Sequence, residues 1–424
     1  MKIITVSDCP ALCTGLAKVH RNVIDGLADE GHEVLPCVWF GFDTNTLTRM
    51  KLGDPAPELW HETPSGKRIQ MAPVPKRKNF DEVRQMFDIL EMSKPDIVLT
   101  IGDYIDFYYM QALKVKREFS FKWFAYLTIE MEEIDERIAP VLKYADILAA
   151  PTKFGTKVLE KHADCPVHYI PYGVDPCFRR LGEGERKRLR EERGIKEGEF
   201  RFITVAQNTM RKNLPCLMQA VACLGKEADN MRFYLHTNVE GFDPQEASIY
   251  LLRKIASKLG VSDKFEFPKE PPSMFSGVAE EKLVEEYNAS DAFVTPTLAE
   301  GFGLPLCEAM ACGLPVIAAD VSCLPEHLGA RINRLLPGDP CERGWLAETR
   351  EQVYAPDAIV QVPRSVCLAA RLLDCSRADP TLVAEMGRNC QEYAKGLRWE
   401  ATKRGLCEAV EKATGPSRIP VETV

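Results

Sequence analysis

The residues best suited to chemistry are two carboxylates, Glu300 and Glu308, which flank a Gly-Phe-Gly turn at 301–303. Backbone N–H groups of a glycine turn, together with the positive end of a helix that follows it, form a site for an anion. Carboxylates accept hydrogen bonds from hydroxyl groups. An anion site with a carboxylate on each side therefore suits a ligand with a diphosphate in the middle and hydroxyls at both ends, as in a nucleotide sugar.

The elements that position these carboxylates follow from the neighbouring residues. Residues 290–294 have the composition of a strand end, and 315–319 that of a new strand. Between them, Pro305 suits the first turn of a helix and Gly313 the position just past its end. The segment therefore predicts strand, glycine turn, short helix and strand. The first glutamate then lies in the loop at the strand's carboxyl end. The second lies about one turn inside the helix, on the face that can look toward the same crevice.

The run from Glu300 to Val316 resembles the E-x7-E signature of the retaining group 1 glycosyltransferases, which have the GT-B fold. The resemblance implies that Glu300 approaches the ring hydroxyls of the transferred sugar and that Glu308 binds the ribose. It also implies that the backbone of the turn holds the sugar and the β-phosphate, through Gly301, Phe302, Gly303 and Leu304. The alternative, an ordinary strand–loop–helix with two solvated glutamates, is disfavoured because the whole run matches. A glycosidase acid/base pair is rejected because it needs no helix N-terminus for a diphosphate.

A second segment, 206–213, lies where the family carries Gly-Arg, four residues and then Lys. Lys212 matches that lysine, whose ammonium would neutralise the diphosphate and the charge that develops as the sugar leaves. The arginine position holds Gln207, which is a departure. Either Arg211 supplies the missing charge or Gln207 hydrogen-bonds the phosphate. We predict that Lys212 and Arg211 are catalytic together with Glu300; a solvated helix start is the alternative.

Three further positions are predicted from the same resemblance. Gly15, at the entry to the first helix, is expected to let the backbone approach the donor, although the family usually has two glycines there. A plain helix N-terminus is the alternative. Asn238, at the carboxyl end of a strand, is expected to bind the donor. Glu130 and Asp103 follow strands of the first half, where relatives place a His or an acid, and are the acceptor-side candidates. Surface-loop acids are the alternative reading of these two.

Strand-like and helical patterns alternate along the chain, which predicts an α/β fold with parallel sheets. The resemblance implies two Rossmann-like domains that face a cleft: an acceptor-binding domain at 1–175 and a nucleotide-sugar-binding domain at 176–395. A C-terminal helix and tail at 396–424 would cross back to the first domain. The mixed-sign charge run at 179–200 predicts a solvated linker helix in preference to an anion or nucleic-acid patch. Residues 329–362 receive no assignment.

Composition narrows the class of protein. The 424 residues, with 45% hydrophobic and 27% charged side chains, are typical of a soluble globular protein of two or three domains. A net charge of −8 excludes the overall basic field that drives non-specific nucleic-acid binding. We find no signal peptide and no run of about 18 apolar residues. We expect a cytoplasmic protein and leave peripheral membrane attachment open.

The sequence contains none of the Cys, His or Asp patterns that would indicate a metal or cofactor site. The 15 cysteines form no Cys-x-x-Cys pair, which favours reduced, buried thiols over a metal site or disulfide framework. No Asp-x-Asp follows a strand, and the seven histidines are scattered. We therefore expect no metal and no cofactor. This agrees with the resemblance, because GT-B enzymes use positive side chains and helix dipoles in place of Mg²⁺.

The sequence predicts a retaining, metal-independent transfer of a hexosyl group from a nucleotide-diphosphate sugar, of the UDP-sugar or GDP-mannose kind, to an acceptor hydroxyl. Gln207 keeps open a non-catalytic nucleotide-sugar-binding module. A DNA-base-modifying sugar transferase is a further alternative on the same fold. A phosphorylase would need a pyridoxal phosphate lysine motif near the C-terminus, which we do not find. The base, the sugar, the acceptor and the oligomeric state are not revealed.

Overall fold

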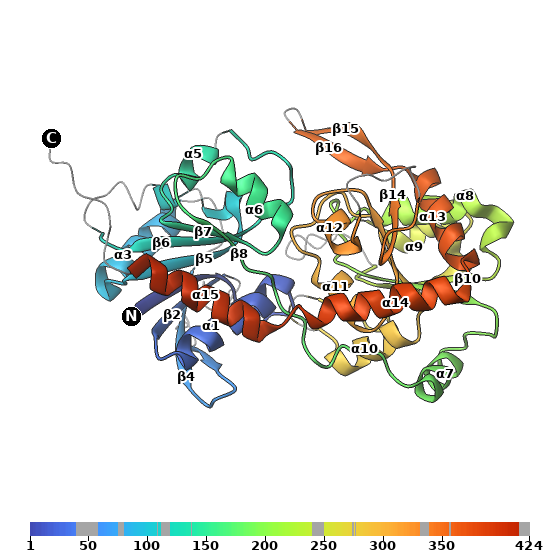
Figure 1. Cartoon of the computed structure of the whole chain (residues 1–424), viewed down its shortest axis with the longest axis horizontal. Helices are drawn as coiled ribbons and strands as arrows, with labels where there is room; N and C mark the ends of the chain where they lie inside the picture. The colour runs from blue at the N-terminus through green and yellow to red at the C-terminus, as the bar shows by residue number, and fades with distance from the viewer. Residues whose placement is uncertain are drawn as a thin grey trace, which may run out of the picture. The chain divides into compact units, whose positions relative to one another are not determined.

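The computed structural model describes residues 1–39, 58–74, 80–107, 109–111, 119–136, 138–239, 250–273, 275, 277–330, 339–355 and 358–414. It divides into two compact units (Figure 1). Unit 1 is Met1–Gly173 together with the segment that begins at Trp399, and unit 2 is Val174–Arg398. The sequence had placed the corresponding boundaries after residues 175 and 395.

Unit 1 is built on a sheet with the strand order β3-β4-β2-β1-β5-β6-β7-β8. Its pairings are parallel except for the antiparallel pair β3 and β4. The central strands are apolar on both faces because helices cover both sides of such a sheet. The strands are β1 (Lys2–Asp8), β2 (Glu33–Trp39), β3 (Leu59–Glu62), β4 (Arg68–Pro73), β5 (Ile97–Asp103), β6 (Lys122–Thr128), β7 (Ile147–Ala150) and β8 (Val167–Tyr169). The helices are α1 (Gly15–Asp29), α3 (Phe80–Ser93), η1 (Tyr104–Phe107), α5 (Ala139–Leu142), α6 (Lys153–Glu160) and α15 (Trp399–Thr414).

The last helix, α15, returns to unit 1, as predicted. It packs against α1 so closely that a Cβ added at Gly26 would lie 2.7 Å from Cγ of Lys403. At its start, a Cβ at Gly173 would lie 2.3 Å from the Trp399 nitrogen. Thr402 donates a 2.6 Å hydrogen bond to the carbonyl of Pro171. Glycine at 26 and 173 is therefore required by the close approach of this helix.

Unit 2 is a second parallel sheet with the strand order β11-β10-β9-β12-β13-β14. The order reverses between β9 and β12, which are neighbours in the sheet, and ligands of open α/β sheets bind at such switch points. The strands are β9 (Phe200–Val205), β10 (Met231–His236), β11 (Phe265–Glu266), β12 (Ala292–Thr295), β13 (Val316–Ala319) and β14 (Gly344–Ala347). The helices are α7 (Glu183–Glu192), α8 (Leu214–Leu224), η2 (Gly225–Ala228), α9 (Leu252–Lys258), η3 (Ser262–Lys264), α10 (Glu280–Asn288), α11 (Leu304–Ala311), α12 (Leu324–Leu328), α13 (Ser365–Arg377) and α14 (Pro380–Lys395).

The unassigned segment 329–362 contributes β14 and most of a separate antiparallel hairpin. That hairpin consists of β15 (Thr349–Ala355) and β16 (Ala358–Pro363). Residues 331–338 and 356–357 of the segment lie outside the described part of the chain. The segment is long because a strand and a hairpin, each with its own connections, replace one simple loop.

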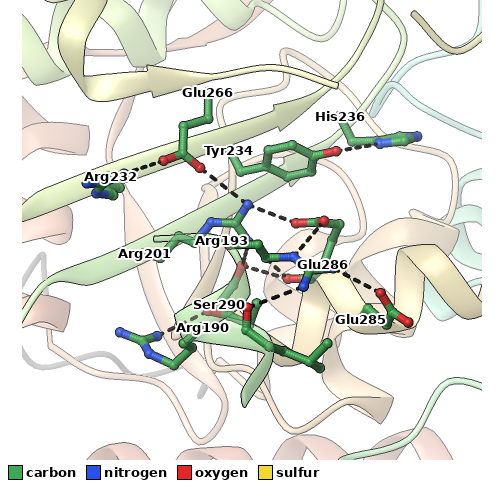
Figure 2. Close-up of polar contacts among 12 residues, drawn as sticks. Arg190, Arg193, Arg201, Arg232, Tyr234, His236, Glu266, Glu285, Glu286 and Ser290 are labelled. Atoms are coloured by element: carbon green, nitrogen blue, oxygen red, sulfur yellow. Dashed lines mark hydrogen bonds and ion pairs between the residues drawn. The ribbon is translucent and has the colours of Figure 1, made fainter. Parts of the chain in front are cut away.

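A partly buried ionic network ties α7 and α10 to the sheet of unit 2 (Figure 2). We call it the Arg201 network; its charged members are Arg190, Arg193, Arg201, Arg232, Glu266, Glu285, Glu286 and Asp291. At its centre, Glu286 accepts 2.8 Å hydrogen bonds from both Arg193 and Arg201. The Arg201 guanidinium also lies 4.6 Å from the centroid of the Tyr234 ring.

The predicted linker helix at 179–200 is α7, most of whose residues are exposed, but the Arg201 network engages some of the segment's arginines. Arg190 of α7 donates to Asp291 at 2.8 Å, and Arg193 pairs with Glu285 at 3.0 Å. The Arg193 side chain is 17% exposed. Mixed-sign charge is typical of a solvated helix. The partners of these arginines are 92 and 101 residues away in the chain, so the local pattern does not contain them.

Candidate active site

The three residues predicted to be catalytic meet at the switch point of unit 2. Arg211 and Lys212 lie in the loop that follows β9, and Glu300 lies in the loop that follows β12. Because β9 and β12 are parallel neighbours, their carboxyl ends meet at the same edge of the sheet. This pairing of strands brings Lys212 and Glu300, which are 88 residues apart in the chain, into contact.

The two cations converge on one carboxylate. The Lys212 ammonium donates a hydrogen bond to Oε2 of Glu300. Arg211 Nη1 lies 3.6 Å from the other oxygen, Oε1, and donates to the carbonyl of Ala299 at 2.8 Å. Lys212 and Glu300 are 14% and 13% exposed, whereas Arg211 is 37% exposed. Lys212 is therefore the sheltered cation and Arg211 the accessible one.

The ion pair decides the charge state of Glu300. Burial raises the pKa of this carboxyl, but the charges of Lys212 and Arg211 and the hydrogen bonds they donate outweigh burial, so its pKa lies below the ordinary value. Glu300 is consequently ionised at neutral pH. A sheltered carboxylate of this kind can accept hydrogen bonds from the hydroxyl groups of a sugar.

The glycine turn after Glu300 has the conformation that the sequence predicted. Gly303 precedes α11 with φ of +85°, and a Cβ there would lie 3.2 Å from Cγ of Glu300. Pro305 lies in the first turn of α11, and Gly313, with φ of +77°, follows the helix end. The N–H of Leu314 donates to the carbonyl of Ala309 and closes that end.

Three side chains that the sequence did not predict, Ser322, Cys323 and His327, contact the glycine turn after Glu300. The Glu300 N–H donates to Ser322 Oγ at 3.2 Å. The Cys323 thiol donates to the carbonyls of Glu300 at 3.1 Å and Phe302 at 3.7 Å. Phe302 packs edge-on against the His327 ring at 5.1 Å. Burial lowers the pKa of His327 to about 4, so this ring supports the turn as a neutral group.

Two residues other than glycine adopt left-handed backbone conformations beside the site. Asn213 has φ of 50° and Ser322 has φ of 48°. Such conformations cost free energy and gather at functional sites, where the surrounding structure holds them. Asn213 occupies the N-cap position of α8, although its side chain makes no capping hydrogen bond.

Glu308 lies inside α11 and is 5% exposed. The Tyr287 hydroxyl lies 3.4 Å from Glu308 Oε2 and 3.1 Å from the carbonyl of Pro305. Burial, followed by the nearby charge of Glu308, raises the pKa of Tyr287 well above its usual value, so it remains a hydrogen-bond donor. Tyr287 is the residue after Glu286 in α10, so the Arg201 network holds the helix that carries this hydroxyl.

The other donor-side candidates follow neighbouring strands. Gln207 is exposed just after β9, and Asn238 is half-buried just after β10. Two buried polar residues lie beside them, Asn208 and Thr237, each 1% exposed. Asn208 donates to the carbonyl of Tyr250 at 2.7 Å. Within the described residues, Asn208 Oδ1 and Thr237 Oγ1 accept no hydrogen bond, which marks them as further candidates.

The remaining predicted residues belong to unit 1. Gly15 is the first residue of α1, where Thr14 Oγ1 accepts from the Ala17 N–H at 3.1 Å. Asp103 ends β5 and accepts a 2.6 Å hydrogen bond from Thr128 at the end of β6. Glu130 lies two residues beyond β6. The structure therefore places these three within the first Rossmann-like unit, apart in the chain from the carboxylates of unit 2.

The described residues contain no group of three or more His, Cys, Asp or Glu side chains arranged to hold a metal ion. All 15 cysteines are free thiols. No helix in the described part of the chain is both long enough and apolar enough to span a bilayer.

Comparison with known proteins shows what the segment that carries this site is similar to. Residues 185–348 match the family model described as glycosyl transferases group 1. A D-inositol 3-phosphate glycosyltransferase of Streptomyces avermitilis is 30% identical over 67% of this chain and 55% of its own length. An MMP alpha-(1->4)-mannosyltransferase of Mycolicibacterium hassiacum is 28% identical over 69% of this chain and 58% of its own length. The chain thus spans somewhat more than half the length of these curated relatives.

Solved structures show the fold. A sucrose-phosphate synthase from Thermosynechococcus elongatus superposes with a TM-score of 0.72 at 20% identity, covering 98% of this chain and all of that one (100%). Anabaena HepE in complex with UDP-glucose gives a TM-score of 0.66 at 14% identity, covering 97% of this chain and 100% of its own. These likenesses confirm the predicted GT-B fold with two Rossmann-like domains.

Proposed function

We propose that this chain transfers a glycosyl group from a nucleotide-diphosphate sugar to an acceptor hydroxyl with retention of configuration, and the match of residues 185–348 to the family model of glycosyl transferases group 1 supports this proposal. The observation that carries the proposal is the convergence of Lys212 and Arg211 on Glu300 at the switch point of unit 2. The N-terminal end of α11 faces the same loop, which adds backbone N–H donors for an anion.

Each group has a role in this proposal. Lys212, Arg211 and the N–H groups of 301–304 hold the diphosphate and the negative charge that develops as it leaves. Glu300 accepts hydrogen bonds from the ring hydroxyls of the sugar, and Glu308 accepts those of the ribose. The acceptor attacks from the face on which the nucleotide diphosphate departs, and a phosphate oxygen of the leaving group takes the acceptor's proton. No metal ion is required, because cationic side chains and the helix end supply the positive charge.

The relatives suggest the kinds of substrate. Inositol phosphate and mannosyl groups appear in the names of the curated relatives, and UDP-glucose appears in a structural neighbour. We propose a hexosyl donor linked to UDP or GDP and an acceptor that is a polyhydroxylated ring. Acidic and hydroxyl groups at Asp103, Thr128 and Glu130 of unit 1 suit such an acceptor, because each can accept hydrogen bonds from hydroxyls.

A thermal-shift screen of nucleoside diphosphates and nucleotide sugars tests the donor. At a concentration about 100 times the dissociation constant, a true donor should stabilise the protein by about 2.7 kcal/mol. A donor-hydrolysis assay on each stabilising nucleotide then separates an enzyme from a binding module. Activity should survive excess EDTA. Loss of activity that Mg²⁺ or Mn²⁺ restores would overturn metal independence.

A further inference from the structure

The carboxylate proposed to bind the sugar is paired in the structure with the cation proposed to bind the diphosphate. Lys212 and Glu300 are both about 14% exposed or less, and Arg211 also lies within ion-pair distance of the same carboxylate. Lys212 has a compact ammonium with three N–H donors, and each N–H donates to one strong acceptor at a time. A diphosphate bound at Lys212 must therefore replace Glu300 as its partner or crowd a second negative charge against it.

We propose that Glu300 competes with the diphosphate for Lys212 and thereby makes the site prefer the nucleotide sugar over the nucleoside diphosphate product. This inference rests on the proposed function. When a nucleotide sugar binds, the sugar hydroxyls donate to Glu300 and replace the hydrogen bond that it loses from Lys212. When the nucleoside diphosphate binds alone, no hydroxyls arrive. Glu300 is then left as a sheltered carboxylate beside a phosphate.

The cost to the product complex follows from burial. A charge that loses its partner in a sheltered site is destabilised by the full desolvation penalty, whereas a charge that exchanges one partner for another is not. The Lys212–Glu300 pair can re-form as the product leaves, and this favours release. The position of Glu300 in the loop after β12, fixed by Ser322 and Cys323, keeps the carboxylate within reach of Lys212 throughout.

Proton uptake provides a second consequence of the same geometry. The pair with Lys212 and Arg211 holds the pKa of Glu300 below its ordinary value. Replacing that pair by a phosphate raises this pKa, so binding of the nucleoside diphosphate favours protonation of Glu300. The titratable groups that face Glu300 from the surrounding loops and helices are Lys212, Arg211, Cys307, Cys323 and His327. Burial raises the pKa of both thiols and lowers that of His327, so all three stay neutral near neutral pH.

Calorimetric titration of the full chain tests the competition, with UDP against UDP-glucose and GDP against GDP-mannose as probes. In Glu300→Gln, the nucleoside diphosphate of the pair that binds should bind about tenfold more tightly than in the wild type, which corresponds to about 1.4 kcal/mol. The nucleotide sugar should bind no more tightly, because the variant also loses the acceptor for the sugar hydroxyls. The preference for nucleotide sugar over product should therefore shrink by about tenfold or more.

Glu308→Gln is the matched control, since it removes a carboxylate from the same turn-and-helix segment without touching Lys212. It should weaken the nucleoside diphosphate and the nucleotide sugar alike. If Glu308→Gln tightens the nucleoside diphosphate as much as Glu300→Gln does, the effect is general electrostatics and the competition is overturned. Unchanged preference in Glu300→Gln would overturn it as well. Binding of neither nucleotide pair to the wild type would overturn the proposed function itself, and this inference with it.

A measurement on the wild type guards against an unstable variant. The nucleotide sugar is compared by calorimetric titration with an analogue whose hexose lacks one or more ring hydroxyls. The analogue should bind about tenfold more weakly and lose much of the preference over the nucleoside diphosphate, because it leaves Glu300 without a hydroxyl donor. Equal binding of the analogue and the nucleotide sugar would contradict the competition. Both arms need only the folded wild-type chain.

Discussion

Unit 2 contains two clusters built from the same kinds of charged side chain, at different ends of one sheet. In the Arg201 network, Arg201 is the second residue of β9 and Asp291 immediately precedes β12. In the candidate active site, Arg211, Lys212 and Glu300 follow the carboxyl ends of those same two strands. The first cluster binds helices to the sheet through many partners (Figure 2), whereas the second gathers two cations on one carboxylate.

The contrast shows how a functional cluster differs from a structural one. In the Arg201 network the Arg201 side chain is 2% exposed and shares carboxylates with Arg193 and Arg232. In the candidate site Arg211 is 37% exposed, and two residues beside the site, Asn213 and Ser322, have a strained left-handed backbone. A cluster of charged side chains therefore does not by itself identify a ligand site. The position of the cluster at the switch point and the accessibility of its cations identify the site.

The largest expected effect is on stability, in the Arg201 network. Glu286→Ala removes the shared partner of Arg193 and Arg201 and leaves a buried guanidinium poorly compensated. The free energy of unfolding should fall by about 3–5 kcal/mol. Chemical denaturation measures this, with Glu285→Ala as the more exposed neighbouring control. A loss below about 1 kcal/mol would show that the network does not anchor α10.

The next largest effect is on catalysis, at Lys212. Lys212→Ala should raise the transition-state free energy by about 3–4 kcal/mol, or about 10²–10³ in kcat, because one sheltered cation faces the leaving group where the family usually has two. Arg211→Ala should cost as much if Arg211 replaces the arginine that Gln207 displaces, and less if its guanidinium faces solvent. Steady-state kinetics on the identified donor compares these variants. Near-wild-type turnover in Lys212→Ala would show that the phosphate is held elsewhere.

Glu308 should affect binding more than chemistry. If its carboxylate accepts both ribose hydroxyls, Glu308→Ala should weaken the nucleoside diphosphate by about 1.5–3 kcal/mol. The loss should be smaller for the 2′-deoxy nucleotide, which lacks one of the two hydroxyls. Calorimetry with both nucleotides checks this, and equal losses for the two would argue against ribose contact at the 2′ position.

Tyr287 should show the smallest effect. Tyr287→Phe removes a hydroxyl 3.4 Å from Glu308 and 3.1 Å from the Pro305 carbonyl and leaves the ring in place. We expect nucleotide binding to weaken by about 0.5–1.5 kcal/mol, because Glu308 loses an orienting donor. Affinity for inorganic diphosphate, which has no ribose, should not change. Parallel loss for both ligands would assign Tyr287 a purely structural role.

The sequence predicted what local pattern and spacing determine. The strand predicted at 315–319 is β13, which spans Val316–Ala319. The glycine turn and both ends of α11 also followed from residue type, because Gly303, Pro305 and Gly313 each have a specific backbone preference. The pairing of α7 with α10, the left-handed Asn213 and the hairpin β15–β16 did not, because each depends on partners distant in the chain or on context.

At the candidate site, too, the sequence predicted the residues of a local motif and not those that depend on the fold. Glu300, Glu308 and Lys212 were found because they lie in a recognisable motif. Tyr287, Ser322 and Cys323 were missed because they carry no motif and act through the fold. A polar residue at the end of a helix that precedes the glutamate strand is the one signal that could have pointed to Tyr287.

The most direct test compares one cation from each cluster in a single experiment. The appropriate nucleoside diphosphate is titrated calorimetrically into the wild type, Lys212→Ala and Arg193→Ala, at a temperature at which all three are folded. The account predicts that affinity falls at least tenfold in Lys212→Ala and stays within about twofold of the wild type in Arg193→Ala. Equal affinity in the wild type and Lys212→Ala, or a larger loss in Arg193→Ala, would contradict the assignment of the carboxyl-end cluster as the donor site.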